Sequence, residues 1–514
     1  MTVTLQQLWT HLDENLPGQD KKLFGLADKN HIGAEAGYLF GTPEGIWKDA
    51  DDEPAGSARF LTAISDLVAS AKSHVDILTM ERPRGLFFRA LTRAFERIAD
   101  AKLPNVVTVR LLMGKIASPD IINIEDMLNQ IVKALGPSRA GRLDIYVGQT
   151  RWEMASWNHA KAIAVDEARM LVGGHNMWDH DYLQAEPVCD VTMRVDGQIA
   201  AGAHRFAEEL WGFVRKWNTV SGSHTFSHRL NPSLTIEKNT TPGYRSYGPG
   251  APSGSMPALW VTCPGWGVFF DGNNRRIVKD GNLLCFEKAM LSATHCRMSL
   301  QDIGSDKLTD YRDFEEHAYD GHPYRLIACQ GFFFQLELID AYAEFLSRNW
   351  TNRLHIVLTS PAAGGRDYSH LVPPSVIYNV LSYRMWKKHG VSKADCLKKF
   401  NPPTSQLVLG AVSLKDRNTW PGTGNPIRNH AKFWMVDGRL MYVGSGNFYP
   451  HVKRVITENA PGHHPEFGMT ADLPLATAQM IAGSYFDPML KYAHKVGAEL
   501  SHMTWKEDAA AAAE

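Results

Sequence analysis

The sequence lacks several features that would assign it to a special class of protein. Its six cysteines are scattered over 514 residues without a CxxC pair, which excludes a zinc-ribbon pattern and a dense disulfide framework. The 54 Lys and Arg residues are balanced by 55 Asp and Glu, for a formal charge of −1, so the global basic excess common among nucleic-acid binders is absent. No stretch approaches the roughly 18–20 uninterrupted apolar residues of a membrane span. The first residues also lack the basic segment and apolar run of a secretory signal.

What remains is an ordinary globular composition, with 44% hydrophobic and 21% charged residues. The chain is too long for one typical domain of about 100–200 residues, so two domains or one duplicated domain are expected. We expect a soluble protein that is cytoplasmic as made, and the sequence leaves open an export route without a cleaved signal.

One four-residue motif occurs twice, and each copy is followed by the same spacing of further residues. An aspartate follows the motif lysine after four residues, and a glycine-rich turn ending in asparagine follows after six more. The first copy is Asn158-His159-Ala160-Lys161, Asp166 and Gly173-Gly174-His175-Asn176; the second is Asn429-His430-Ala431-Lys432, Asp437 and Gly444-Ser445-Gly446-Asn447.

The surrounding sequence alternates between helical and strand-like apolar patterns, which predicts an α/β fold with mixed, mainly parallel sheets flanked by helices. The repeat is too long for a solenoid, so we expect two homologous domains in a pseudo-twofold arrangement with one site at their interface. Helices over Gln198–Trp217 and Leu475–His494 should close the two halves. The expected parts are an irregular lead-in packed on the first domain (1–57), the first domain (58–217), a Ser/Pro/Gly-rich linker (218–260), the second domain (261–498) and a tail (499–514).

The spacing of His159 and Lys161 has a direct geometrical meaning. Residues two apart on a strand point to the same face, so both side chains should project from the mouth of a hairpin toward one site. Histidine can act as a nucleophile or a general acid near neutral pH, and two such pairs suit in-line displacement at an anionic centre. Lys161, Lys432 and the amides of Asn176 and Asn447 would hold the phosphate oxygens.

The doubled HxKxxxxD pattern, followed by GG or GS and then asparagine, resembles the phospholipase D superfamily. Its wider context is similar to the two-motif bacterial phospholipases D of the secreted actinomycete type. The similarity covers roughly residues 58–216 and 280–495. It includes Ser156-Trp157-Asn158-His159, Asp181-Tyr182-Leu183, Pro187-Val188-Cys189-Asp190-Val191, Gln301-Asp302 and Glu466-Phe467-Gly468.

The resemblance implies a phospholipase D that forms phosphatidate through a phosphohistidine, acts at a membrane surface and has an internal pseudo-dimer in a monomeric chain. It implies that His159 is the nucleophile and His430 the acid and then the base. Asp190 and Glu466 would orient the two rings, although close relatives commonly carry aspartate at the second position. Asp166, Asp437, Gly173, Gly174, Gly444 and Ser445 would be structural residues of the motifs, with no cofactor and no metal required.

Other interpretations remain open from the sequence. A nuclease of the same superfamily is one, disfavoured by the neutral charge and the built-in duplication. Cardiolipin synthases share the motif but carry transmembrane segments. An inactive lipid-binding effector scaffold is a third. The pair His463-His464 resembles half of a metal site, but no third ligand is in register, so a surface loop is expected there.

Overall fold

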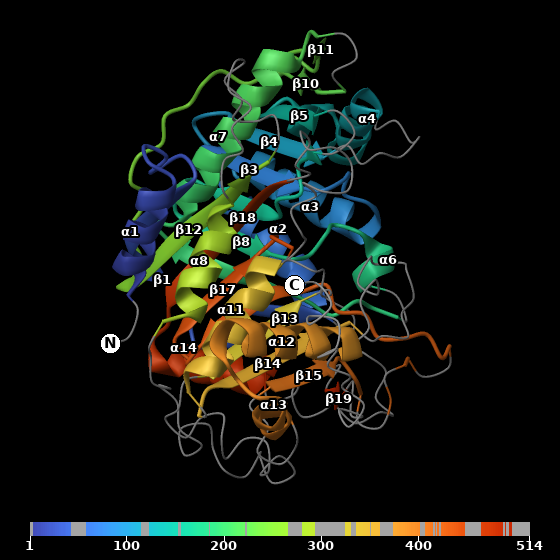
Figure 1. Ribbon diagram of the computed structural model, residues 1–514. Helices are drawn as coiled ribbons and strands as arrows, with labels where there is room; N and C mark the ends of the chain where they lie inside the picture. The colour runs from blue at the N-terminus through green and yellow to red at the C-terminus, as the bar shows by residue number, and fades with distance from the viewer. Residues whose placement is uncertain are drawn as a thin grey trace.

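The computed structural model describes residues 4–42, 58–114, 123–152, 156–183, 186–220, 224–265, 280–292, 324–329, 336–349, 351–359, 374–400, 407–414, 417, 419–420, 423–447, 464–486, 489 and 493–495. Strands run through the middle of the molecule and helices pack outside them, with the first half at the top of Figure 1 and the second half below. The predicted α/β class with helix-flanked mixed sheets is confirmed.

The first half builds its part of the sheet from three parallel strands followed by three antiparallel ones. The strands are β3 (His74–Thr79), β4 (Val107–Gly114), β5 (Leu143–Trp152), β7 (Ala162–Val165), β8 (Arg169–Gly173) and β9 (Asp190–Gly197). Their order in space is β5-β4-β3-β7-β8-β9. The two-residue β6 (Ser156–Trp157) pairs with the end of β5 and leads into the first motif.

Helices cover this part of the sheet because their apolar residues recur at helical spacing. They are α2 (Ala58–Ala69), α3 (Gly85–Asp100), α4 (Ile124–Leu135), α5 (Pro137–Ala140), α6 (Asp179–Tyr182) and α7 (Ala200–Trp217). α4 shows how the sequence sets the bounds of a helix. The Asn123 side chain accepts from Asp126 N at the start, and Gly136, with φ 74°, ends the helix.

The second half repeats the strand order with different sequence. Its strands are β13 (Tyr324–Cys329), β14 (Arg353–Leu358), β15 (Leu407–Ala411), β16 (Lys432–Val436), β17 (Leu440–Gly444) and β18 (Pro465–Asp472). They lie in the order β15-β14-β13-β16-β17-β18, with the first three parallel. The helices are α8 (Gly281–Met290), α11 (Leu336–Arg348), α12 (Pro374–His389), α13 (Lys393–Phe400) and α14 (Leu475–Ile481).

The predicted long helix over Leu475–His494 is wrong. The α-helix ends at Ile481 and continues as a π-helical turn, Ala482–Phe486. His494 and Lys495 form β19, which pairs antiparallel with β15. The helical spacing of apolar residues therefore continues past the residue at which the α-helix ends.

The N-terminal segment, expected to be irregular, joins the two halves. Its elements are α1 (Leu5–Asn15), β1 (Phe24–His31) and β2 (Leu39–Thr42). β1 pairs with β9 on one side and with β12 (Met256–Pro264) on the other, and β12 pairs with β18. One continuous series of strands thus runs from the first half into the second.

Helix α1 packs on the second half and not, as expected, on the first. Its buried leucines, among them Leu8 and Leu12, share a core with Phe286 of α8 and Tyr342 of α11. Figure 1 shows α1 beside α8 and β12. The helix begins with a capping box formed by Thr4 and Gln7, which explains its sharp start.

The Ser/Pro/Gly-rich segment after α7 is more ordered than a linker. It contains a hairpin of β10 (Phe226–Leu230) and β11 (Ile236–Lys238), and β10 extends the first half of the sheet by pairing with β5. The expected linker end at residue 260 also falls inside β12. Cys189, Cys263, Cys285 and Cys396 are buried free thiols, in line with the sequence prediction.

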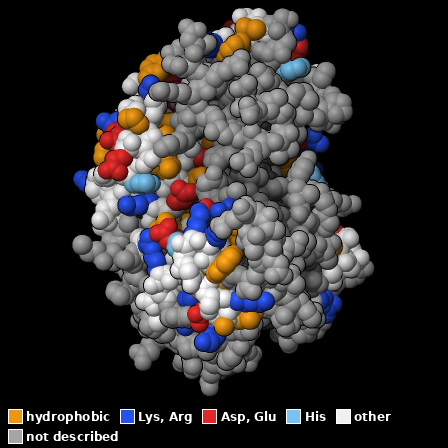
Figure 2. Space-filling view, in the orientation of Figure 1, with side chains coloured by type: hydrophobic (Ala, Val, Ile, Leu, Met, Phe, Trp, Pro, Cys, Tyr) orange, Lys and Arg blue, Asp and Glu red, His pale blue; other side chains and the backbone are white. Residues whose placement is uncertain are grey.

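The side of the molecule shown in Figure 2 has no described patch of a single charge sign. On the side shown in Figure 2, Lys and Arg side chains are interspersed with Asp and Glu. Among the described residues, no helix combines the length and apolar character needed to cross a membrane.

Candidate active site

Both motifs enter the site in the same way, immediately before the first strand of a hairpin. His159 precedes β7, and His430 precedes β16. The asparagine before each histidine fixes the backbone. Asn158 Nδ2 donates to Leu112 O at 3.0 Å, and Asn429 Nδ2 donates to Val357 O at 3.2 Å. Each asparagine Oδ1 accepts from the alanine N two residues on, at 3.1 Å. The motif asparagines therefore place the two histidines equivalently.

Each histidine is held by a carboxylate from the opposite half of the chain. His159 Nδ1 lies 2.7 Å from Glu466 Oε1, and His430 Nδ1 lies 2.7 Å from Asp190 Oδ2. The backbones cross over as well, since His159 N donates to Pro465 O at 3.0 Å and His430 N donates to Cys189 O at 2.7 Å. Fixing Nδ1 in this way leaves Nε2 of each ring for chemistry. The two motifs are thus brought into one site.

The motif lysines fold back onto the histidines that precede them. Lys161 Nζ donates to His159 O at 2.7 Å and lies 3.3 Å from His159 Nδ1. Lys432 Nζ donates to His430 O at 2.5 Å. Both lysines are almost fully buried, at 5% and 0% exposure. Two buried amines therefore lie beside the two rings, and in their protonated forms they make the site suitable for an anionic group.

The first glycine turn packs directly against Asp190. A Cβ on Gly174 would lie 2.1 Å from Asp190 Oδ1, so only glycine fits without displacement. Tyr182 OH donates to Asp190 Oδ2 at 2.9 Å and accepts from Asn176 N at 3.2 Å. The Asn176 Oδ1 atom is buried without a hydrogen-bond partner. The turn thus joins Asn176 to the carboxylate that holds His430. Gly173 is equally constrained by the backbone of Val191.

The second glycine turn has similar backbone packing but fewer hydrogen bonds. Gly444 approaches the backbone of Gly468 on β18, and Ser445 Oγ accepts from Phe467 N at 3.0 Å. Both amide atoms of Asn447 are buried without hydrogen-bond partners. So are both amide atoms of Asn282, from the first turn of α8, which lies against Gly446. The two amides have unmet hydrogen-bonding capacity at this turn.

The motif aspartates lie at the far ends of the hairpins, away from the histidines. Asp166 has a φ of 52° and accepts hydrogen bonds from the backbone N–H groups of Lys72, Ser73 and His74 at 2.6–2.9 Å. Asp437 occupies the equivalent turn with a φ of 53° and is buried. The geometry places Asp166 in a turn where it ties the hairpin to the start of β3.

Burial and neighbouring charge keep the histidines neutral near pH 7. Burial lowers the pKa of His159 well below its usual value, and the charges of Lys161 and His464 lower it further. Burial, aided by Lys432, lowers the pKa of His430 to about 4. Burial also lowers the pKa of Lys161 to about 7. A neutral ring has the free lone pair that a nucleophile or a base requires.

The two carboxylates differ in their electrostatics although their positions are equivalent. Burial would raise the pKa of Asp190, but the adjacent His430 and His175 and the hydrogen bond to His430 hold it well below its usual range. Burial raises the pKa of Glu466 to about 8. Glu466 Oε2 is buried without a hydrogen-bond partner, whereas both oxygens of Asp190 accept hydrogen bonds. Asp190 is therefore ionised at neutral pH, and Glu466 is largely protonated.

Several residues near the site had no role in the sequence prediction. Tyr182 was part of a family-like segment, but its contact with Asp190 was not foreseen. His175 is bonded on both ring nitrogens, to Thr42 and Thr192 hydroxyls at 2.8 Å each. His464, expected in a surface loop, stacks on the His159 ring with centroids 5.6 Å apart. Its position two residues before Glu466 was the available signal.

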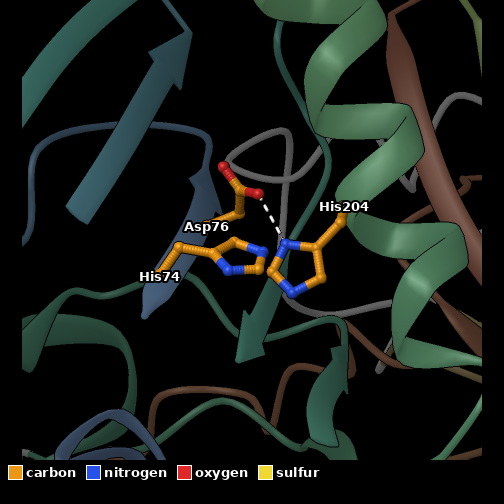
Figure 3. Close-up of side chains that lie close together, drawn as sticks. All are labelled: His74, Asp76 and His204. Carbon is orange, nitrogen blue, oxygen red and sulfur yellow. Dashed lines mark hydrogen bonds and ion pairs between the residues drawn. The ribbon is translucent and has the colours of Figure 1, made fainter. Parts of the chain in front are cut away.

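Three residues outside the site are arranged as a metal centre would be. His74 and Asp76 come from β3 and His204 from α7, and Figure 3 shows the three side chains facing one another. Their possible ligand atoms lie within 4.8 Å of one another. However, Asp76 is bonded through both oxygens to Arg110 at 2.7 Å and to His204 Nδ1 at 2.6 Å.

The Arg110 guanidinium bonded to both Asp76 oxygens opposes a second cation, so the donor set does not fit a metal ion. Arg110 also bonds to Glu208 Oε2 at 2.6 Å and to the Tyr247 hydroxyl. Tyr247 comes from the segment between the halves, and its ring stacks on His204 at 5.1 Å. The cluster is a buried ionic network that anchors this segment to the first half.

Two predicted features lie outside the described residues, namely Gln301-Asp302 and His463. Two tryptophans near the first motif, Trp157 and Trp178, each bury an indole N–H group without a hydrogen-bond partner. The Trp157 ring contacts the His464 ring in a tilted arrangement with centroids 4.1 Å apart, and the Trp178 ring stacks on His180 with centroids 5.4 Å apart.

The fold and the crossed histidine–carboxylate pairs define a duplicated-motif α/β protein with a single shared site. No family model matches the chain. A curated protein named phospholipase D, from Streptomyces antibioticus, is 26% identical over 537 residues, covering 97% of this chain and 89% of that protein. The crystal structure of phosphatidylserine synthase from Haemophilus influenzae Rd KW20 matches with a TM-score of 0.50 and 14% identity, covering 95% of this chain and 92% of that chain. The predicted resemblance to the phospholipase D superfamily is confirmed.

Proposed function

We propose that the protein is a phospholipase D, which hydrolyses glycerophospholipids to phosphatidate and a headgroup alcohol and transfers phosphatidyl groups to other alcohols. At the coarser level the chain is an enzyme, a phosphodiesterase, and the similarity over 97% of its length to a protein named phospholipase D supports this. The observation that carries the finer proposal is the crossed pair of histidine–carboxylate contacts, both 2.7 Å long.

In the proposed reaction, His159 Nε2 attacks phosphorus and a P–N bond forms while the bond to the headgroup oxygen breaks. His430, which would take up a proton from solvent at Nε2 when the anionic substrate binds, gives that proton to the leaving oxygen. The free His430 has a pKa of about 4, and a bound phosphodiester anion would raise that pKa by adding negative charge. The ionised Asp190 would then stabilise the imidazolium through Nδ1.

In the second step, His430 takes a proton from water or an alcohol, whose oxygen attacks phosphorus as the P–N bond breaks. Lys161, Lys432, Asn176 and Asn447 would hold the non-bridging oxygens in both steps. The Asn447 Nδ2 donor, which is buried without a hydrogen-bond partner, would gain one on phosphate binding. Because the lysines supply the positive charge, the proposal requires no metal and no cofactor.

Headgroup release from vesicles of phosphatidylcholine, phosphatidylethanolamine and phosphatidylserine tests this proposal. We expect turnover of at least one phospholipid, and its loss in His159→Ala and in His430→Ala. His389→Ala is a matched control because His389 lies exposed at the end of α12, so its activity should equal that of the wild type. Intact vesicles with degraded DNA would identify a nuclease. Vesicle binding without turnover would support the inactive scaffold.

The assignment of roles needs a separate measurement. After rapid quenching of a reaction with labelled phospholipid in a neutral denaturant, because the P–N bond is labile in acid, we expect phosphoryl label on His159 in the wild type. Label on His430 alone, on both histidines or on neither would contradict the assignment. The comparison is sharpest with His430→Gln, which should still form the intermediate slowly from a substrate with a good leaving group and then accumulate it.

A further inference from the structure

Three consecutive residues, His464 and the first two residues of β18, all contact His159. The His464 ring stacks on the His159 ring, with centroids 5.6 Å apart and planes 30° apart. Pro465 O accepts from His159 N at 3.0 Å. Glu466 Oε1 lies 2.7 Å from His159 Nδ1. The ring face, the backbone and one ring nitrogen of His159 are therefore restrained by one short segment.

The first half provides a direct comparison, because its strands pair in the same register. Gly173 of β8 pairs with Thr192, two residues after Asp190, and Gly444 of β17 pairs with Gly468, two residues after Glu466. The residue equivalent to His464 is therefore Val188, a buried aliphatic side chain. Cys189 and Asp190 reproduce the backbone and carboxylate contacts to His430, but Val188 has no ring to stack with.

A second difference between the two halves lies next to His464, at the residue before the motif asparagine. The His464 ring also contacts the Trp157 ring, with centroids 4.1 Å apart and planes tilted by 40°, and His464 Nδ1 accepts from Trp157 N at 3.4 Å. The residue equivalent to Trp157 is Arg428, one position before Asn429. An accepting Nδ1 places the proton of a neutral His464 on Nε2. An aromatic pair thus covers one histidine where the other half has an arginine and a valine.

We propose that His464 is a positioning residue, and that the Trp157–His464 pair makes two otherwise equivalent histidines unequal by holding the His159 ring in one plane. The inference rests on the proposed function, in which His159 Nε2 must point along the line of the breaking P–O bond. Rotation of the ring moves that lone pair out of line, and misplacement of about 1 Å at a reacting atom can cost about 100-fold in rate. His430 transfers only a proton, which tolerates a broader range of geometries.

Two substitutions separate the stack from the imidazole nitrogens. His464→Val copies the first half and removes the ring, whereas His464→Phe keeps a ring of similar shape without nitrogens. We expect His464→Val to lower kcat about 10- to 100-fold with KM within about twofold, and His464→Phe to stay within about fivefold of the wild type. Val188→Ala, the matched change at the equivalent position, should alter kcat by less than about threefold. Circular dichroism and thermal unfolding confirm that each variant is folded.

Wild-type kcat in His464→Val would overturn the inference. So would a loss in His464→Phe as large as that in His464→Val, since the nitrogens and not the stack would then matter, or a change confined to KM. The rate at which labelled phosphatidyl accumulates on His159 should fall by the same factor as kcat, and an unchanged rate would contradict the proposed geometry.

A measurement without substrate separates this inference from the proposed function. Diethyl pyrocarbonate modifies accessible neutral imidazoles, and mass spectrometry of the peptide containing residue 159 gives the rate. We expect His464→Val to be modified at least threefold faster at His159 than the wild type, because the covering ring is gone, and His464→Phe to match the wild type. Equal rates in all three proteins would overturn the stacking role. A wild type inactive on every phosphodiester would instead refute the proposed function.

Discussion

Two shape-preserving substitutions, Asp190→Asn and Glu466→Gln, should have effects of different size although the two carboxyl groups occupy equivalent positions. Asp190 is an ionised acceptor for three donors, His430 Nδ1 at 2.7 Å, Val191 N at 2.8 Å and Tyr182 OH at 2.9 Å. Glu466 has one oxygen on His159 and the other without a hydrogen-bond partner. Asp190→Asn therefore replaces a charged carboxylate with a neutral amide, whereas Glu466→Gln replaces a carboxyl group that is already largely neutral.

The magnitude follows from the kind of hydrogen bond that is lost. A hydrogen bond to a charged group contributes about 1.5–3 kcal/mol, so loss of the Asp190 charge as the imidazolium forms on His430 should lower kcat roughly 10- to 150-fold. The same substitution should lower the free energy of unfolding by about 1.5–3 kcal/mol at pH 7. Glu466→Gln keeps the shape and the neutral state, so we expect a loss below about tenfold and little destabilisation.

The pH dependence of stability should differ as well, and its sign follows from the pKa shifts. The pKa of Glu466 is raised to about 8 in the folded protein, whereas an unfolded glutamate ionises near pH 4.3. The wild type should therefore lose stability relative to Glu466→Gln as the pH rises between about 4.3 and 8. The pKa of Asp190 is depressed, so its stabilisation is present above about pH 4 and is lost in more acid solution.

Urea unfolding at pH 5, 7 and 8.5, with kcat measured at the same pH values, tests both claims. Equal destabilisation by the two substitutions at pH 7, or a Glu466→Gln difference that does not change between pH 5 and 8.5, would refute the reasoning. Circular dichroism at pH 7 provides the control for a common native fold. The comparison needs no assumption about the headgroup.

Three further predictions concern positions outside the histidine pair. Gly174→Ala should lower kcat at least tenfold, because its Cβ would lie 2.1 Å from Asp190 Oδ1; headgroup release measures this. Arg110→Met should lower the free energy of unfolding by about 3–5 kcal/mol because it leaves buried acids unpaired, while Arg97→Met, at an exposed ion pair, should cost under about 1 kcal/mol. Asp166→Asn should cost about 2–3 kcal/mol at pH 7 through lost charged hydrogen bonds, and because the pKa of Asp166 is lowered, the difference should vanish in acid.

Much of the site could be predicted because its signals are local. The HxK spacing, the glycine turns and the strand alternation each depend on neighbours in the chain, so the hairpins β7–β8 and β16–β17 lie where the sequence places them. The contact between His159 and Glu466 could not be predicted from residue spacing, because it depends on how the two halves of the chain pack together. A family resemblance supplied the carboxylates, but no periodicity could say which histidine each would contact.

The missed features share a different cause, which is tertiary context. β1 is a polar, turn-flanked segment whose strand conformation depends on β9 and β12, residues far along the chain. Tyr247 lies in a stretch rich in proline and glycine, and its order comes from the buried network around Arg110. His464 resembled a surface residue because its partners, Trp157 and His159, belong to the other half.

The position of β1 has a consequence for the order in which the protein can mature on the ribosome. β1 is made early and ends at residue 31. Its main partner, β12, does not begin until residue 256, which is 225 positions later. At about 5–20 residues per second, translation takes roughly 10–45 s to cover that distance. During this interval the edge of β1 that β12 will cover has no such partner, and an exposed strand edge invites pairing with other chains. The strand that joins the two halves thus has an edge that needs protection while the chain is being made.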